Sequence, residues 1–173
     1  MTGLIGVYEK LAGLYENLPL PAGQILGVAT AVGLGRVRPA PLRGSRALQR
    51  ATGAAAIAAG CALNAWALLE RRRRTSGRFE LEQPESLVTT GPYALSRHPM
   101  YVGWWFIHLG AGLLVGSAWV AATMPAATLV EHLGVLHEEH VLERGFPDEF
   151  AQYRRRVPRY LGLPRRSPRR PTS

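Results

Sequence analysis

The longest uncharged stretch of the chain is residues 98–130, "HPMYVGWWFIHLGAGLLVGSAWVAATMPAATLV", which holds no Asp, Glu, Lys or Arg in 33 residues. A membrane-spanning helix needs roughly 20 mostly apolar residues, so this run is long enough for most of a helical hairpin. Gly116 and Ser117 are the best place for a tight reversal, which predicts one helix over 99–115 and a second from about Ala118. The second helix contains Pro125, where a kink is expected, and turns polar after residue 130. We expect it to leave the membrane and continue into water.

Two further uncharged runs precede the hairpin, at residues 17–35 and 51–69, each 19 residues long. The second is mostly Ala, Leu and Gly with few polar side chains, as in a membrane span, whereas prolines and glycines dilute the first, which we expect to be short, tilted or partly embedded. Small residues at four-residue spacing predict a close helix contact on the second span. They are Ala51, Ala55 and Ala59, with Gly53 and Gly60 nearby. The predicted fold class is all-α, a polytopic integral membrane helical bundle of about four transmembrane helices with a C-terminal helical hairpin.

The segments outside these runs are polar or amphipathic. Apolar residues recur at helical spacing over residues 1–18, which predicts an amphipathic helix in the membrane interface or on the protein surface. Residues 36–50 are read as a loop, residues 79–96 as an ordered loop or a flexible linker, and residues 163–173 as a disordered basic tail.

The formal net charge of +9 is explained by arginines that flank the apolar runs and face lipid headgroups. Nothing suggests a base-stacking platform or a groove-reading helix, so nucleic acid is not a predicted partner. The basic segments 36–50 and 71–97 fall on opposite sides of the second span, so charge does not settle the topology. The hairpin places residues 71–97 and those after about 135 on one side, which we take as cytoplasmic. No signal peptide is evident, and the lone Cys61 allows no internal disulfide.

A basic pair stands directly before the hairpin. Pro99 is favoured in the first turn of a helix, so Arg97 and His98 are expected beside free backbone N–H groups and the positive end of the helix dipole, an arrangement that suits an anion. The alternative is a snorkelling arginine and a capping histidine at an ordinary membrane border. Tyr101 and His108 share a face with an intervening tryptophan, which forms either an interfacial belt or a cavity wall.

A second polar cluster lies in residues 132–160, "HLGVLHEEHVLERGFPDEFAQYRRRVPRY". If the hairpin forms, Glu138 and Glu139 return to the level of Arg97 and His98. The acidic and imidazole groups of residues 137–140 resemble metal ligands by type, but the whole chain has five histidines and offers no convincing second set of ligands. No metal site is predicted.

The segments 91–105, "GPYALSRHPMYVGWW", and 137–160, "HEEHVLERGFPDEFAQYRRRVPRY", together resemble the isoprenylcysteine carboxyl methyltransferase and phospholipid methyltransferase family of integral membrane enzymes. The resemblance covers about residues 87–160. It implies methyl transfer that depends on S-adenosylmethionine, with this cofactor bound by a cytosolic segment and a lipophilic small-molecule or lipid substrate entering from the bilayer. It also implies an integral protein of a bacterial cell membrane whose active site faces the cytoplasm. Oligomeric state is not indicated.

The resemblance also implies roles for individual residues. The donor's carboxylate would use the helix start, its ammonium and ribose would use the paired glutamates, and the basic segment that follows would orient the acceptor. The cofactor-binding residues are expected to be Arg97, His98, Pro99, Tyr101, Gly103, Glu138 and Glu139. The catalytic residues are expected to be Arg156, Tyr153 and Arg159, and the substrate-binding residues Trp104, Trp105 and His108.

The chain is read as one domain. Its predicted parts are the interfacial helix 1–18, two spans in 19–70, a cytosolic loop 71–98, the hairpin 99–143, a cytosolic cofactor and substrate segment 144–162, and the tail 163–173. Two other classes stay open. One is a membrane sterol-type reductase that uses NADPH, and the other is a non-catalytic membrane accessory protein on the same scaffold.

Overall fold

The structure, a computed structural model, describes residues 21–74 and 86–162. The expected interfacial helix 1–18 and the basic tail 163–173 lie outside the described residues, as does the first part of the loop 79–96.

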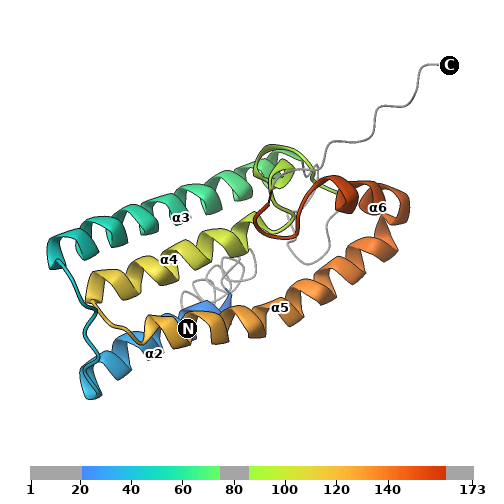
Figure 1. The fold of residues 1–173 in the computed structure, drawn as a ribbon. Helices are drawn as coiled ribbons and strands as arrows, with labels where there is room; N and C mark the ends of the chain where they lie inside the picture. Colours follow the sequence, from blue (N-terminus) through green and yellow to red (C-terminus); the bar gives the residue numbers. More distant parts are fainter. Residues whose placement is uncertain (1–20, 75–85, 163–173) are drawn as a thin grey trace, which may run out of the picture.

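The described residues form a bundle of helices (Figure 1). The elements are α2 (Ala22–Val37), α3 (Arg46–Arg74), the short 3₁₀ helix η1 (Gly91–Ala94), α4 (Pro99–Val115), α5 (Val120–Gly145) and α6 (Pro147–Arg156). Extended pairing among the described residues is limited to one isolated bridge between Pro41 and Ser117. By length and composition, α3 alone of the described helices is long and apolar enough to cross a membrane, and α2 and α4 are apolar but shorter. The helical fold is confirmed, and the count of four spans stays a prediction.

The predicted hairpin is present as α4 and α5. Pro99 occupies the first turn of α4 after the N-cap residue His98, and Gly116 ends the helix in the left-handed conformation with φ of 69°. Its N–H bonds the carbonyl of Leu113 at 3.1 Å and the next N–H, of Ser117, bonds that of Gly112 at 3.0 Å. This pair of bonds is the Schellman motif that glycine favours at helix ends. The second helix begins at Val120, slightly later than expected, because residues 117–119 complete the turn.

Helices α3 and α4 pack side by side along their length (Figure 1). A Cβ placed on Gly53 would lie 2.8 Å from the carbonyl oxygen of Gly110, and one placed on Gly60 would meet the carbonyl oxygen of Gly103. The two backbones therefore touch at two levels seven residues apart. The alanines expected to form this contact, Ala51, Ala55 and Ala59, are exposed instead. The close contact is made by the two glycines named beside these alanines and not by the alanines, because glycine allows a closer backbone approach than alanine.

The loop expected over 36–50 is shorter than predicted, because α2 extends to Val37 and α3 begins at Arg46. The guanidinium of Arg46 donates to the carbonyls of Leu114 and Val115, both at 3.3 Å. A cation at this position satisfies carbonyls that the end of α4 leaves unpaired and complements the helix dipole.

A buried polar network joins α2, α4 and α5. The side-chain oxygen of Gln24 lies 2.6 Å from Nδ1 of His108, whose Nε2 lies 3.0 Å from the hydroxyl of Thr123. The amide nitrogen of Gln24 donates to the carboxylate of Glu131 at 2.9 Å. Each of these buried polar groups therefore has a partner, and the network holds α2 against the hairpin.

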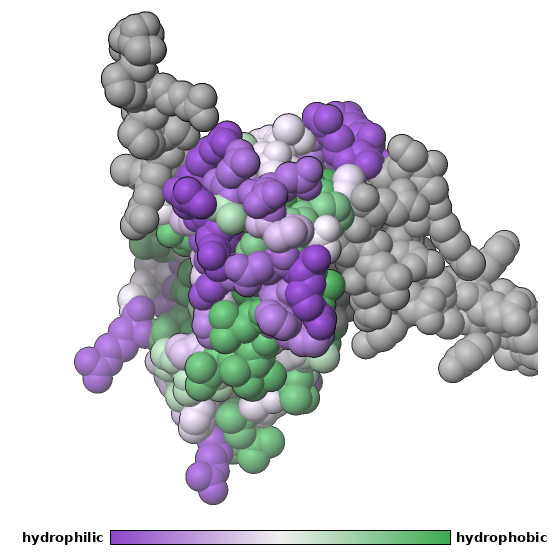
Figure 2. Space-filling view, turned by 90° about the vertical axis from the view of Figure 1, so that its right-hand side faces the viewer, coloured by the Kyte–Doolittle hydropathy of each residue, from purple (hydrophilic) through white to green (hydrophobic). Residues whose placement is uncertain are grey.

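One end of the bundle is polar. Figure 2, which looks onto the end that carries α6, shows hydrophilic side chains gathered there with hydrophobic ones below them. The ends of α3 and α5, the described part of the loop before α4, and α6 all meet at this end (Figure 1). The prediction that the residues before the hairpin and those after about 135 share one side is confirmed for the described residues.

We expect Gly60→Ala to destabilise the protein. The new Cβ meets the backbone of Gly103, which cannot rotate away, so the helices must separate at a cost of about 1–3 kcal/mol in the free energy of unfolding. The matched control is Gly33→Ala, because a Cβ there has no heavy atom within 4 Å. Unfolding by SDS in mixed micelles measures both variants. Equal stability of the two would contradict the described packing.

Candidate functional site

The segment before α4 pairs with the segment after α6. The backbone N–H of Arg97 donates to the carbonyl of Pro158 at 2.9 Å, and that of His98 donates to the carbonyl of Arg159 at 3.1 Å. The hydroxyl of Ser96 donates to the same Arg159 carbonyl at 3.1 Å. These bonds fix the start of the hairpin beside residues about sixty positions later in the chain.

Helix α6 places that later segment. Pro147 starts the helix, acidic side chains occupy its first turn and arginines its last, which is the favoured order. Its inner face buries Phe150 and Tyr153 in a core with Tyr93 of η1. The hydroxyl of Tyr153 donates to the carbonyl of Tyr93 at 2.7 Å, and burial raises the pKa of Tyr153 well above its ordinary value. Tyr153, expected to be catalytic, therefore uses its hydroxyl to attach α6 to the loop before α4.

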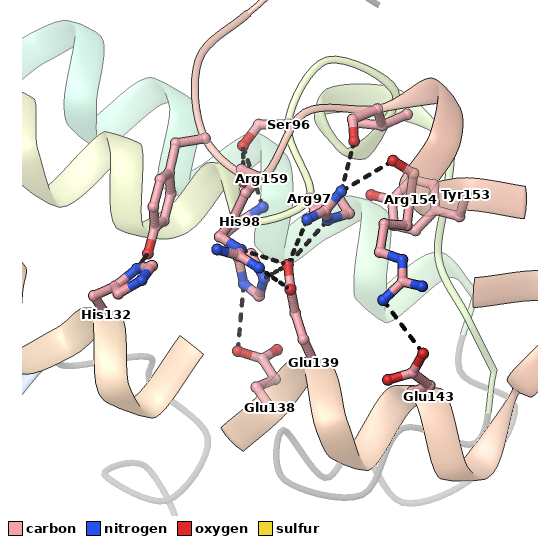
Figure 3. A network of polar contacts seen from close by, with 12 residues as sticks. Ser96, Arg97, His98, His132, Glu138, Glu139, Glu143, Tyr153, Arg154 and Arg159 are labelled. Atoms are coloured by element: carbon pink, nitrogen blue, oxygen red, sulfur yellow. Dashed lines mark hydrogen bonds and ion pairs between the residues drawn. The ribbon is translucent and has the colours of Figure 1, made fainter. Parts of the chain in front are cut away.

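Glu139 is the centre of a charged cluster (Figure 3). Its Oε1 lies 2.8 Å from a terminal nitrogen of Arg97 and 3.2 Å from Nε2 of His98. Its Oε2 lies 2.7 Å from a terminal nitrogen of Arg159. The side chains of Arg97, His98 and Glu139 are each less than a tenth exposed. The cluster therefore unites the start of α4, the middle of the polar half of α5 and the segment after α6.

Arg97 also holds the end of α6. Its other terminal nitrogen donates to the carbonyls of Arg154 at 3.2 Å and Val157 at 2.9 Å. These carbonyls belong to the last turn of α6 and the residue that follows, which lack helical partners and carry the negative end of the dipole. One guanidinium therefore binds a carboxylate and closes a helix end.

Glu138 completes the cluster on its open side. Its Oε2 lies 3.5 Å from Nδ1 of His98, and its side chain is 37% exposed, against 9% for Glu139. His98 is thus bracketed by two carboxylates, one on each ring nitrogen. The side chain of Glu138 is partly exposed, whereas the oxygens of Glu139 are already bound by Arg97, His98 and Arg159.

The pKa values in the cluster shift toward the charged forms. Burial alone would raise the pKa of Glu139, but hydrogen bonds from His98, Arg159 and Arg97 outweigh it and hold that pKa well below its usual range. Burial would lower the pKa of His98, but both glutamates raise it above its ordinary value. The pKa of Glu138 is lowered, since the hydrogen bond and charge of His98 outweigh burial.

An aromatic group links the cluster to an apolar groove. The ring of Tyr160 lies 4.8 Å from that of Trp105, 6.2 Å from that of His98 and 5.9 Å from that of His132. The groove has a volume of about 440 Å³. Its lining residues are Trp105, Met124, Pro125, Thr128, Leu129 and His132. Tyr160 therefore stands between a charged site and a groove suited to an apolar chain.

The structure brings most of the predicted cofactor residues together. Arg97, His98, Glu138 and Glu139 form the cluster with Arg159, which was expected to be catalytic. Buried Pro99 starts α4 beside it, and the ring of Tyr101 lies 5.8 Å from that of His98. Trp105 lines the groove, as expected of a substrate-binding residue. His132 and Tyr160 were not among the predicted site residues, although both lie within the quoted segment 132–160. Each is an isolated residue, and neither forms a regular spacing with other polar residues that would indicate a site.

Five predicted residues lie elsewhere. Arg156 is exposed on α6 and donates to Gln152 at 3.3 Å, so its guanidinium is outside the cluster. Gly103 packs against α3, and His108 is sealed in the network with Gln24. Trp104 is half-buried but does not line the groove, and Tyr153 supports α6 as described above. These placements argue for structural or surface roles at positions where the sequence suggested contact with ligands.

Within the described parts of the chain, no group of three or more His, Cys, Asp and Glu side chains is placed to hold a metal ion. The absence of a metal site elsewhere in the chain stays a prediction.

The fold and the charged cluster together describe the kind of protein this is. It is a helical protein with a long apolar helix, a charged site at one end of the bundle and an apolar groove beside that site. The family model described as phospholipid methyltransferase matches residues 48–149, more than half of the chain, and the chain belongs to this family. The resemblance predicted from the two motifs is confirmed.

Individual relatives match about half of the chain. The nickel-cobalt-cadmium resistance protein NccN of Alcaligenes xylosoxydans xylosoxydans is 40% identical over 87 residues, which are 50% of this chain and 38% of the relative. Protein-S-isoprenylcysteine O-methyltransferase of Schizosaccharomyces pombe is 38% identical over 80 residues, covering 45% of this chain and 33% of that protein. The Homo sapiens protein of the same name is 32% identical over 87 residues, covering 49% and 30%. The chain thus spans about a third of the length of these relatives.

We expect Glu139→Gln to destabilise the protein strongly. Loss of this carboxylate leaves buried Arg97 without its anionic partner, which costs about 3–5 kcal/mol for a buried pair. The matched control is Glu143→Gln on the same helix, where Glu143 pairs with Arg154 at 3.3 Å and both side chains are about half exposed. That control should cost less than about 1 kcal/mol. SDS unfolding in mixed micelles compares them, and similar losses would contradict the central role of Glu139.

Proposed function

We propose that this protein transfers a methyl group from S-adenosylmethionine to a carboxylate, hydroxyl or amine of a lipophilic acceptor at the membrane–cytosol interface. The observation that carries the proposal is the position of the charged cluster directly beside the apolar groove, with Tyr160 between them. Membership of the phospholipid methyltransferase family and the printed names of the isoprenylcysteine O-methyltransferase relatives support methyl transfer as the reaction. We place the charged cluster on the cytoplasmic face of a bacterial cell membrane.

The chemical groups of the cluster fit the proposed donor. S-adenosylmethionine carries a carboxylate, an ammonium, ribose hydroxyls, an adenine ring and a sulfonium, and it supplies an electrophilic methyl group when bound. The partly exposed guanidinium of Arg159 and the positive end of α4 suit its carboxylate. Half-exposed Glu138 suits its ammonium or ribose. The faces of Tyr160 and Tyr101 suit an adenine ring or a sulfonium cation.

The two glutamates receive different roles. Both oxygens of Glu139 are bound by Arg97, His98 and Arg159. Glu139 therefore holds these three side chains in position and offsets the repulsion between the two arginines. Glu138 has a partly exposed side chain and one ion pair, with His98, so it is the carboxylate that would contact the donor. Arg159, not Arg156, is the arginine that reaches the site from the segment after α6.

The groove would hold the apolar part of the acceptor. Trp105 and the α5 residues that line it exclude water from one side of the site, while the charged cluster orients the polar groups on the other. Transfer of a sulfonium methyl group needs little activation of the donor. The protein's contribution is therefore alignment of the acceptor in a dry pocket, which removes much of the entropic barrier.

Cofactor binding tests the proposal against the alternative classes. We expect S-adenosylhomocysteine to raise the melting temperature of the full chain in detergent, because a ligand that binds only the folded state stabilises it by mass action. NADPH should have no such effect. Stabilisation by NADPH alone would indicate a sterol-type reductase, and stabilisation by neither would indicate a non-catalytic accessory protein.

We expect Glu138→Gln to weaken S-adenosylhomocysteine binding at least about tenfold while leaving the melting temperature of the unliganded protein nearly unchanged. The reason is that Glu138 is half-exposed, so its loss removes a ligand contact but leaves the Glu139 pairs intact. Isothermal titration calorimetry measures the affinity, with Glu143→Gln as the control. Unchanged affinity would remove Glu138 from the donor site.

A further inference from the structure

His132 occupies a place that neither the charged cluster nor the apolar lining explains. It lies on α5 two turns before Glu139, to one side of the charged network in Figure 3, and it is half-buried. Its Nδ1 lies 2.8 Å from the hydroxyl of Tyr160, and its ring lines the apolar groove. Among the residues that the structure describes, its Nε2 has no hydrogen-bond partner.

The bond to Tyr160 orients the imidazole. Tyr160 is itself held by ring contacts with Trp105 at 4.8 Å and His98 at 6.2 Å, so its hydroxyl is a fixed partner. When Nδ1–H donates to the tyrosine oxygen, the lone pair of Nε2 is left available to a group in the groove. A histidine fixed through one nitrogen and open at the other is the usual form of a general base.

We infer that His132 is the general base of the proposed methyl transfer and that the acceptor is a lipophilic hydroxyl compound, a phenol or an alcohol, whose apolar part lies in the groove. This inference rests on the proposed function and narrows its acceptor class. A carboxylate acceptor is already ionised at neutral pH and needs no base. A hydroxyl acceptor must lose a proton, and a histidine beside the groove has a role for this class of acceptor. An amine acceptor must also lose a proton, but its ammonium form is costly to bury in a groove lined mostly by apolar side chains, whereas a neutral hydroxyl group is far less so.

The hydroxyl oxygen of the acceptor attacks the methyl carbon of the sulfonium donor, and the new O–C bond forms as the C–S bond breaks. The sulfur keeps the bonding electron pair and becomes a neutral thioether. The hydroxyl proton passes to Nε2 of His132, and the imidazolium that forms still donates from Nδ1 to Tyr160. Water restores neutral His132 after the products leave.

The test uses two acceptors with the same apolar chain, para-nonylphenol and para-nonylbenzoic acid, and the full chain with radiolabelled S-adenosylmethionine. We expect His132→Gln to lower turnover of the phenol about 100- to 10 000-fold, the usual contribution of a general base. Turnover of the benzoate and affinity for S-adenosylhomocysteine should both stay within about threefold. Added imidazole should restore part of the lost phenol turnover.

Two further variants separate catalysis from folding. Tyr160→Phe keeps the ring that packs on Trp105 and removes the bond to His132, so it should lower phenol turnover about tenfold and spare the benzoate. His137→Gln changes an exposed histidine on the same helix and should change neither reaction.

The inference is overturned if His132→Gln keeps phenol turnover or lowers turnover of both acceptors equally. It is also overturned if the unaltered protein binds S-adenosylhomocysteine but methylates the benzoate alone or neither acceptor. Failure of the unaltered protein to bind S-adenosylhomocysteine would overturn the proposed function itself, so the two failures are distinguishable.

Discussion

The pairing of one buried carboxylate with three cationic groups is the interaction on which the polar end of this protein depends. Glu139 comes from α5, whereas Arg97 and His98 precede α4 and Arg159 follows α6. A buried ion without partners is far more costly than one within a hydrogen-bonded network. The hairpin, α6 and the last described segment must therefore adopt one arrangement together. Any other arrangement would leave a buried charge without its partner and would be higher in free energy.

The glycine contact between α3 and α4 frees the other side of α4 for the site. Gly103 touches α3, while Trp105, two residues later, lines the groove. Two residues correspond to about 200° around a helix, so these positions face nearly opposite ways. A bulkier residue at the packed position would move α4 and shift the wall of the groove. The glycines at the contact between α3 and α4 thus affect the site indirectly, because they set the position of α4.

The site combines two environments within a short distance. Its charged half is a largely buried network of paired side chains, whereas its groove is bordered by apolar side chains, including Leu129, which is 67% exposed. An apolar side chain with that exposure is expected to face lipid. Tyr160 has an apolar ring and a polar hydroxyl, and it suits the boundary for that reason. This boundary is where the proposed water-soluble methyl donor and lipophilic acceptor would meet.

The sequence by itself determined the helical class, the hairpin with its turn at Gly116, and the return of the paired glutamates to the level of Arg97 and His98. Each follows from local patterns, namely apolar run length, a glycine that permits a left-handed helix end, and helix rise. Only the tertiary structure decided which arginine after residue 153 enters the cluster. Arg156 ends α6 on its outer face, while Arg159 lies in a segment whose backbone pairs with the start of α4.

The environments of His108 and His132 also depend on tertiary structure. Both ring nitrogens of His108 are bound, by Gln24 of α2 and by Thr123, whereas His132 lines the groove and is bound through Nδ1 to Tyr160. In both cases the environment of an imidazole depends on which side chain binds its Nδ1. That partner lies many residues away in the chain, and local sequence pattern holds no information about contacts at that distance.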